Sequence, residues 1–205
     1  DDPTRRPARA ATLPPMAAAL LKSARKFASY GAVLLIVWWA DPQQTLVTVG
    51  LGMVVVGIAV RIWGCGHLEK NLLVVTTGPY AHVKNPLYLG TLCCMTGFLL
   101  AASSTEGTGR WILFGLLPIY VLGFYVYYLP RKYRVEKNRL RERFGEAFDR
   151  YDGAVNDFLP RARPWHSGDD RCFRWSLVWS NHEPPMDLLI LAVFAAIARR
   201  GDLPF

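Results

Sequence analysis

The stretch Thr45-Leu-Val-Thr-Val-Gly-Leu-Gly-Met-Val-Val-Val-Gly-Ile-Ala-Val-Arg-Ile-Trp63 decides the fold, because it is almost wholly apolar and its one charge is at Arg61. A helix that crosses a bilayer needs about 20 mainly apolar residues, and this run approaches that length once its flanks are included. Three further runs have the same character, and they cover residues 27–40, 87–103 and 111–129.

A fifth apolar run, at residues 185–198, is shorter. By length it is expected as a tilted span, a re-entrant segment or a helix that lies against the bundle. Together the runs predict an all-α fold, a polytopic membrane helix bundle with four to five transmembrane helices. The expected spans are about 24–40, 44–63, 87–103, 110–129 and 185–199.

Composition supports the membrane class and a single domain. Of the 205 residues, 52% are hydrophobic and only 20% are charged, which is too apolar for an ordinary soluble domain. In a large soluble protein, four such runs would leave too little polar surface to cover them. The four cysteines lack metal-ligand or disulfide spacing, so no metal site is expected. Residues 1–20 are expected as a disordered basic tail, and residues 21–205 as one membrane domain.

The basic residues are unevenly distributed, and this predicts an orientation. The net charge is +8, and 12 of the 24 Lys and Arg lie between Pro130 and Pro184. Six more precede the first run, whereas the turns at 41–44 and 104–109 carry none. By the positive-inside rule the N-terminus faces the cytoplasm, together with the polar segments at 64–86 and 130–184. Anionic lipid headgroups are the expected partner of this charge, rather than nucleic acid.

The segment after Arg131 has the period of an amphipathic helix on the cytosolic side. Its apolar stripe, at spacings of three and four, consists of Tyr133, Glu136, Leu140, Phe144, Ala147 and Tyr151. Glu136 is anomalous there, because a bare buried carboxylate is costly. It is expected either to pair within the helix, with Lys132 or Arg139, or to contact a ligand.

Two polar, aromatic blocks lie at the ends of the apolar runs. The first is Thr77-Gly-Pro-Tyr-Ala-His-Val-Lys-Asn-Pro-Leu-Tyr-Leu-Gly90. The second has Glu136-Lys137, Leu140, Phe144-Gly145, Phe148 and Tyr151, followed by Leu159-Pro160-Arg161 and Pro164. Neither block is needed merely to cross a membrane, so they indicate a site at the membrane surface.

Over residues 60–165 these blocks resemble the membrane-embedded methyltransferases that include isoprenylcysteine carboxyl methyltransferase and the phospholipid N-methyltransferases. The family pattern is G-P-Y-x-x-V-R-H-P-x-Y-x-G, then a pair of spans, then E-E-x-x-L-x-x-x-F-G-x-x-Y-x-x-Y. The resemblance implies S-adenosylmethionine as cofactor, in a pocket at the cytosolic membrane face, and methyl transfer to a lipid-soluble acceptor. The acceptor classes left open are a phospholipid amine, a prenylcysteine-like carboxylate and a small hydrophobic amine or thiol.

The resemblance also implies which residues hold the cofactor. Those carried over from the family's cofactor-binding positions are Leu73, Val74, Val75, Tyr80, Asn85, Pro86, Leu87, Tyr88 and Glu136. Gly64 and Gly66 match the glycine motif of the phospholipid enzymes. Lys132 occupies the position that contacts substrate in the isoprenylcysteine enzymes. A carboxylate and aromatic faces suit a sulfonium cation.

Two departures from the family bear on catalysis. The Arg-His of the family is Lys84-Asn85 here, and asparagine cannot titrate. The doubled glutamate is Glu136-Lys137, which leaves one acidic anchor. The resemblance implies Lys132 and Asn85 as catalytic candidates, and His82 is the nearby titratable candidate, with a structural role as its alternative. A carboxylate acceptor needs no general base, whereas an amine must first lose its proton.

Other functions are also compatible with the sequence. A reductase similar to sterol reductases would bind NADPH and could use Arg161 and Arg163 for the 2′-phosphate. A non-catalytic membrane scaffold or transporter is the third candidate. Near the C-terminus, Asn181, His182 and Glu183 either belong to an interface helix or close the pocket from that side. The final residues carry no eukaryotic-style retention signal, which favours a prokaryotic inner membrane.

Overall fold

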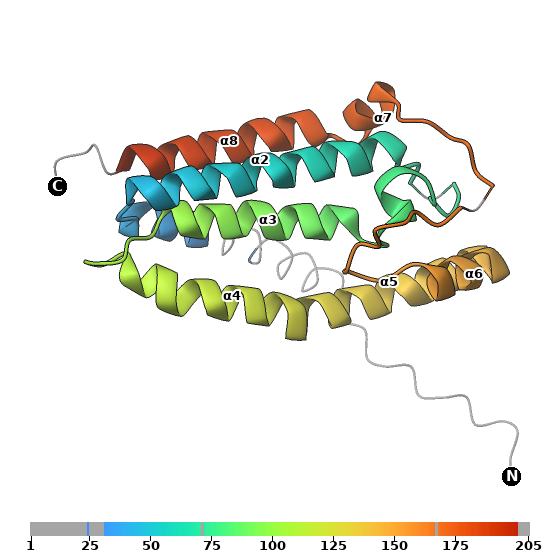
Figure 1. Ribbon diagram of the computed structural model, residues 1–205, viewed down its shortest axis with the longest axis horizontal. Helices are drawn as coiled ribbons and strands as arrows, with labels where there is room; N and C mark the ends of the chain where they lie inside the picture. Colours follow the sequence, from blue (N-terminus) through green and yellow to red (C-terminus); the bar gives the residue numbers. More distant parts are fainter. Residues whose placement is uncertain (1–23, 25–30, 71, 167, 201–205) are drawn as a thin grey trace, which may run out of the picture.

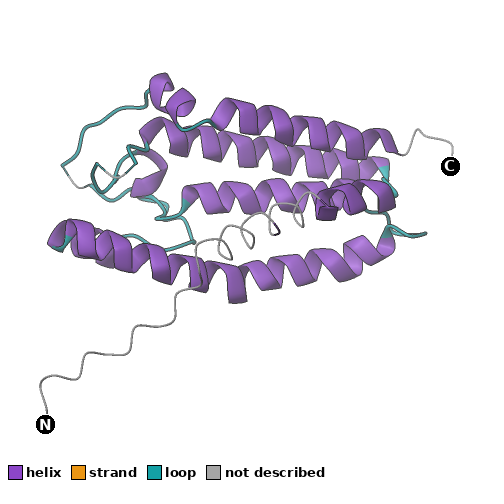
Figure 2. Ribbon diagram, turned by 180° about the vertical axis from the view of Figure 1, so that it is seen from behind, coloured by secondary structure: helices purple, strands orange, loops and turns teal. Residues whose placement is uncertain are grey.

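The computed structural model describes residues 24, 31–70, 72–166 and 168–200. The predicted disordered tail and most of the first half of the first predicted span lie outside them. Within the described residues every regular element is a helix, and none is a strand, which confirms the all-α class. The elongated bundle has its main helices side by side along the long axis (Figures 1 and 2).

Helix α2 (Gln44–His67) is one of two described helices that are long and apolar enough to be candidate membrane spans. At about 1.5 Å per residue its 24 residues extend about 36 Å, more than the roughly 30 Å of a bilayer core. It packs along α3 (Pro86–Ala101) through small residues. A Cβ placed on Gly97 would lie 2.5 Å from the carbonyl oxygen of Gly50, so the two backbones touch. Such close approach is typical of helix pairs in membranes.

The second candidate span is a continuous helix of 33 residues, from Ile112 to Phe144. It consists of a π-helical turn η2 (Ile112–Leu116), α4 (Leu117–Gly123), a second π-helical turn η3 (Phe124–Tyr128) and α5 (Leu129–Phe144). The sequence predicted a span end at Pro130, but the helix continues through it. Pro130 lies in the first turn of α5, directly after η3, where regular i→i−4 bonding is already interrupted.

The predicted amphipathic helix of residues 131–151 is two helices, so the prediction of a single one was wrong. The helix is interrupted at Gly145, where φ is 51°, a backbone conformation that glycine adopts more easily than other residues. Helix α6 (Glu146–Ala154) begins there and packs Phe148, Tyr151 and Val155 into a small core of its own.

The remaining elements complete the bundle. A short 3₁₀ helix η1 (Gly78–Ala81) precedes α3, and α7 (Trp175–Ser180) leads into α8 (Glu183–Arg199). Residues 31–39 are helical as well. The main core joins the 31–40 segment, α2, α3, η2 and α8, with Val54, Leu99 and Ile197 almost fully buried.

Large apolar side chains cover much of the outer surface of the long helices. Val55 and Val56 on α2, and Phe114, Ile119 and Leu122 on the second long helix, are all more than half exposed. A soluble monomer rarely exposes such a continuous apolar face. This exposed apolar surface agrees with the two candidate membrane spans.

Candidate functional site

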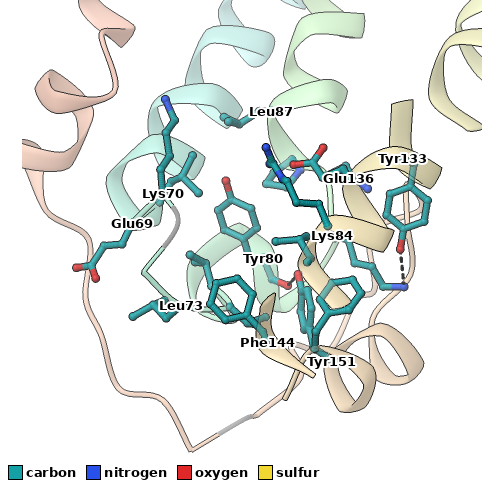
Figure 3. Close-up of a pocket in the computed structure, with 18 of the residues that line it drawn as sticks. Glu69, Lys70, Leu73, Tyr80, Lys84, Leu87, Tyr133, Glu136, Phe144 and Tyr151 are labelled. Carbon is teal, nitrogen blue, oxygen red and sulfur yellow. Dashed lines mark hydrogen bonds between the residues drawn. The ribbon is translucent and has the colours of Figure 1, made fainter. Parts of the chain in front are cut away.

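A cavity of about 380 Å³ lies where η1, the start of α3, α5 and α6 meet (Figure 3). The structure brings nine of the sequence-predicted cofactor residues into its lining. They are Leu73, Val74, Val75, Tyr80, Asn85, Pro86, Leu87, Tyr88 and Glu136. The two sequence blocks therefore meet at one cavity although a pair of helices separates them in the chain.

The blocks are joined directly by Tyr88 and Glu136. The Tyr88 hydroxyl donates a hydrogen bond of 2.9 Å to Oε2 of Glu136, across 48 positions of sequence. Among the ion pairs of the described residues none involves Glu136, so the alternative pair with Lys132 or Arg139 is not formed. Glu136 is half-buried and lines the cavity, so its carboxylate is available to a cationic ligand group.

Tyr80 lies at the centre of the labelled side chains in Figure 3. It is 8% exposed, and its backbone carbonyl accepts a 2.8 Å hydrogen bond from the Tyr151 hydroxyl. Its own hydroxyl has no hydrogen-bond partner among the described residues. Burial raises the pKa of Tyr80 well above its usual value, with further contributions from Cys65, Tyr151 and Glu136. The hydroxyl is therefore neutral at physiological pH and is a free donor to a ligand.

Lys84 holds the outer wall of the cavity through a buried charge network. Its side chain is 7% exposed, and Nζ lies 2.6 Å from Oδ1 of Asp152 and 2.7 Å from Oδ1 of Asp157. Nζ also donates to the Tyr133 hydroxyl at 3.3 Å. Burial alone would raise the pKa of Asp152, but hydrogen bonds from Lys137, Lys84 and Tyr133 outweigh it and hold that pKa at about 2. Sequence reasoning missed this role, although the basic residue in a cofactor motif was a signal for it.

His82 and Asn85 both anchor the segment that follows α6. Nδ1 of His82 lies 2.8 Å from the carbonyl oxygen of Arg161, and the backbone amide of Arg161 donates to the His82 carbonyl. His82 is absent from the cavity lining, so its geometry is that of the structural alternative. Asn85 lines the cavity but donates its amide to the carbonyl of Asp157 at 3.1 Å.

Gly64, Gly66 and Lys132 lie outside the cavity lining. A Cβ on Gly64 would lie 2.9 Å from Cδ2 of Leu87, which does line the cavity. A Cβ on Gly66 would lie 2.1 Å from the ring of Phe173. The two glycines thus permit close packing behind the wall, and Lys132 is exposed on α5.

The lining also contains residues that were not among the predicted cofactor-binding positions. From the loop after α2 come Leu68, Glu69 and Lys70, and from α5 and α6 come Tyr133, Arg139, Leu140, Phe144, Phe148 and Tyr151. The stripe deduced from helical periodicity predicted the shared face of most of the second group. Aromatic and aliphatic side chains therefore dominate the cavity, which has two carboxylates, Glu69 and Glu136, the second bonded to Tyr88.

The lining differs from what the other candidate chemistries require. Arg161 and Arg163, the predicted cations for a 2′-phosphate, are not part of it, and Nη1 of Arg161 donates to the Ala154 carbonyl at 2.5 Å. Over the described ranges, no group of three or more His, Cys, Asp and Glu side chains is placed to hold a metal ion.

No protein-family model matches the chain, and no solved structure matches it. The nickel-cobalt-cadmium resistance protein NccN of Alcaligenes xylosoxydans xylosoxydans is 32% identical over 127 residues. The match covers 60% of this chain and 54% of NccN, so the similarity extends over about half the length of that protein.

Proposed function

We propose that the protein is an integral-membrane methyltransferase that uses S-adenosylmethionine and acts on a lipid-soluble acceptor. The observation that carries the proposal is the convergence of both sequence blocks on one cavity, joined by the Tyr88–Glu136 hydrogen bond. A structural role for either block alone would not require their polar side chains to meet.

The cavity fits the cofactor in size and in chemistry. Its volume of about 380 Å³ lies in the usual range of roughly 300–1,000 Å³ for small-molecule sites. Leu73, Val75 and Phe144 offer apolar surface for a flat nucleobase. The Glu136 carboxylate and the Tyr80 ring suit a cationic sulfonium or amino group.

S-adenosylmethionine, when bound, supplies an electrophilic methyl group on a sulfonium, and methyl transfer is an in-line displacement. What the chain must do is orient the reactants and exclude water. Tyr80 and Glu136 orient by hydrogen bond and charge, and the apolar lining excludes water. A carboxylate or thiolate acceptor fits without a protein base. For an amine acceptor, burial favours the neutral, nucleophilic form.

The membrane arrangement is part of the proposal. Four to five helices cross the inner membrane of a prokaryote, with the N-terminus and the cavity on the cytoplasmic side. The exposed apolar faces of α2 and of the 112–144 helix support this, as do the seven Lys and Arg of α5 at the cavity end. Membrane lipids and a lipophilic or lipidated substrate are the proposed partners.

The test is a calorimetric titration of detergent-purified protein with S-adenosylhomocysteine. We expect saturable binding that Glu136→Gln weakens by a factor of about ten or more, or about 1.4 kcal/mol. Glu142→Gln is the matched control, because Glu142 is also on α5 but is exposed and outside the cavity lining. A folded, monodisperse wild type that binds no S-adenosylhomocysteine would refute the proposal. Binding of NADPH instead would favour the reductase. If the protein binds neither compound, the scaffold or transporter is favoured.

A part in resistance to nickel, cobalt or cadmium is a second candidate, which the similarity to NccN favours. It is tested by growth in the presence of each metal, in cells that express the wild type, Glu136→Gln or no protein. Protection that Glu136→Gln abolishes would connect resistance to the cavity. Equal growth in all three strains would remove this candidate and leave the methyltransferase proposal in place.

A further inference from the structure

The segment 169–183 follows the region of family resemblance and lies against the end of α2. Asn181 makes the central contact, since Nδ2 donates to the carbonyl oxygens of Cys65 at 3.1 Å and Leu68 at 3.0 Å. The last carbonyls of a helix have no partner within the helix. The Cys65 carbonyl already accepts from the Leu68 backbone amide at 3.2 Å, and the Asn181 side chain adds a second donor there and one for the Leu68 carbonyl, where α2 ends and the cavity wall begins.

The start of α8 is fixed to the same end of α2 by a buried ion pair. Nε of Arg61 lies 2.5 Å from Oε1 of Glu183, and Nη2 lies 3.0 Å from Oε2. The third guanidinium nitrogen donates to Oγ1 of Thr91 at 2.7 Å, and the thiol of Cys65 lies 3.3 Å from Glu183. Glu183 is 3% exposed. A two-pronged contact of this kind fixes position and angle together.

The wall itself is held from the same side. Glu69, which lines the cavity, pairs with Arg174 and lies 3.7 Å from Nη1 of Arg171. The backbone amide of Arg174 donates to the carbonyl of Gly66 at 2.9 Å. The Phe173 ring packs where any side chain on Gly66 would stand.

The turn between α7 and α8 is strained in a way that serves these contacts. His182 has φ 59° and ψ 29°, and it is the one non-glycine residue with positive φ in the described part of the chain. Such a conformation persists only where the surroundings impose it. Here it reverses the chain between Asn181 and Glu183 so that both reach the end of α2.

We propose that residues 169–183 form a clamp that sets the position of the cavity wall for its ligand, with Asn181 as the central positioning residue. We refer to this segment as the C-terminal clamp. The identity of the ligand rests on the proposed function, but the clamp itself does not. None of residues 169–183 lines the cavity. Ligand affinity then depends on a segment that lies outside the cavity.

The test compares Asn181→Ala with Gln43→Ala. Gln43 is the matched control, because its side chain also makes two hydrogen bonds, both with Thr105, at the opposite end of α2. Amide hydrogen exchange of the 64–76 peptide is measured first, in full-length protein without ligand. We expect Asn181→Ala to accelerate exchange there, and Gln43→Ala to leave it at the wild-type rate.

Affinity for S-adenosylhomocysteine is measured next on the same three proteins. The expected loss for Asn181→Ala is about tenfold, at a temperature where all three remain folded, with no loss for Gln43→Ala. Unchanged exchange in Asn181→Ala overturns the inference, as does equal loss of affinity in both variants. If the wild type binds no S-adenosylhomocysteine but Asn181→Ala still accelerates exchange, the methyltransferase proposal fails and the clamp stands.

Discussion

Replacing Lys84 by methionine removes the cation of the buried network while keeping a side chain of similar length. The ammonium has three donors, and the structure uses all three, on Asp152, Asp157 and Tyr133. Breaking a buried ion pair from one side costs about 3–5 kcal/mol. Asp152 keeps Lys137 and the Tyr133 hydroxyl as partners, so the expected loss is at the lower end, about 3 kcal/mol.

The two carboxylates provide an internal comparison. The Asp152 side chain is 10% exposed and that of Asp157 is 41% exposed. Asp157→Asn should therefore cost less than about 1 kcal/mol, as for a surface pair. In Lys84→Met/Asp152→Asn the second change removes a buried charge that has lost a partner. The double variant should be less destabilised than the sum of the single changes.

The assay is thermal unfolding in detergent, followed by tryptophan fluorescence. A loss of about 3 kcal/mol corresponds to a fall in Tm of about 6–12 °C for a chain of this size. Lys84→Arg is the conservative control, since it keeps the charge. A Lys84→Met protein that melts within about 2 °C of the wild type, less than about 1 kcal/mol, would refute the view that this network holds α6 to the cavity.

Three further predictions concern stability. The pKa of Asp152 is lowered from 3.8 to about 2, so its contribution to the free energy of unfolding is complete above pH 3.8 and is lost as pH falls toward 2. Asp152→Asn should therefore flatten the acid side of the curve of Tm against pH. An unchanged slope would contradict this. His182→Val should lower stability by about 1–2 kcal/mol, whereas His182→Gly should not; equal effects would show that the turn is unstrained. Gly66→Ala should destabilise the protein by about 1–3 kcal/mol, because the new methyl group meets the Phe173 ring. Adding Phe173→Leu to this variant should recover part of the loss. If it does not, the methyl group clashes with another residue.

The apolar runs of the sequence located the long helices well. The run predicted at 44–63 is α2 (Gln44–His67), that at 87–103 is α3 (Pro86–Ala101), and that at 185–199 is α8 (Glu183–Arg199). The length and apolar content of a helix follow from its local sequence, so the pattern of apolar residues is enough to locate it. The errors lie at Pro130 and Gly145, where the backbone conformation of one residue decides whether a helix continues.

The candidate site was predicted only in part. The two motif blocks identified nine of the residues that line the cavity, because their motif residues occur in the same order as in the family pattern. The partners of Lys84 are 68 and 73 positions away, and Arg61 and Glu183 are separated by 122. No spacing rule connects charges at such distances, so pairs of this kind emerge only when the bundle is assembled.

In the proposed membrane arrangement, the unbroken helix from Ile112 to Phe144 would make the geometry of the cavity depend on bilayer thickness. At about 1.5 Å per residue, the roughly 24 residues from Ile112 to Glu136 extend about 36 Å along this helix. A change in tilt of about 10°, within the range by which helices adjust to hydrophobic thickness, would displace the carboxylate of Glu136 by about 6 Å. That is twice the 2.9 Å that separates the Tyr88 hydroxyl from Glu136. Because α3 is held backbone to backbone against α2, this displacement would act on the contacts that cross the cavity, among them the Tyr88–Glu136 hydrogen bond and the Lys84–Asp152 ion pair.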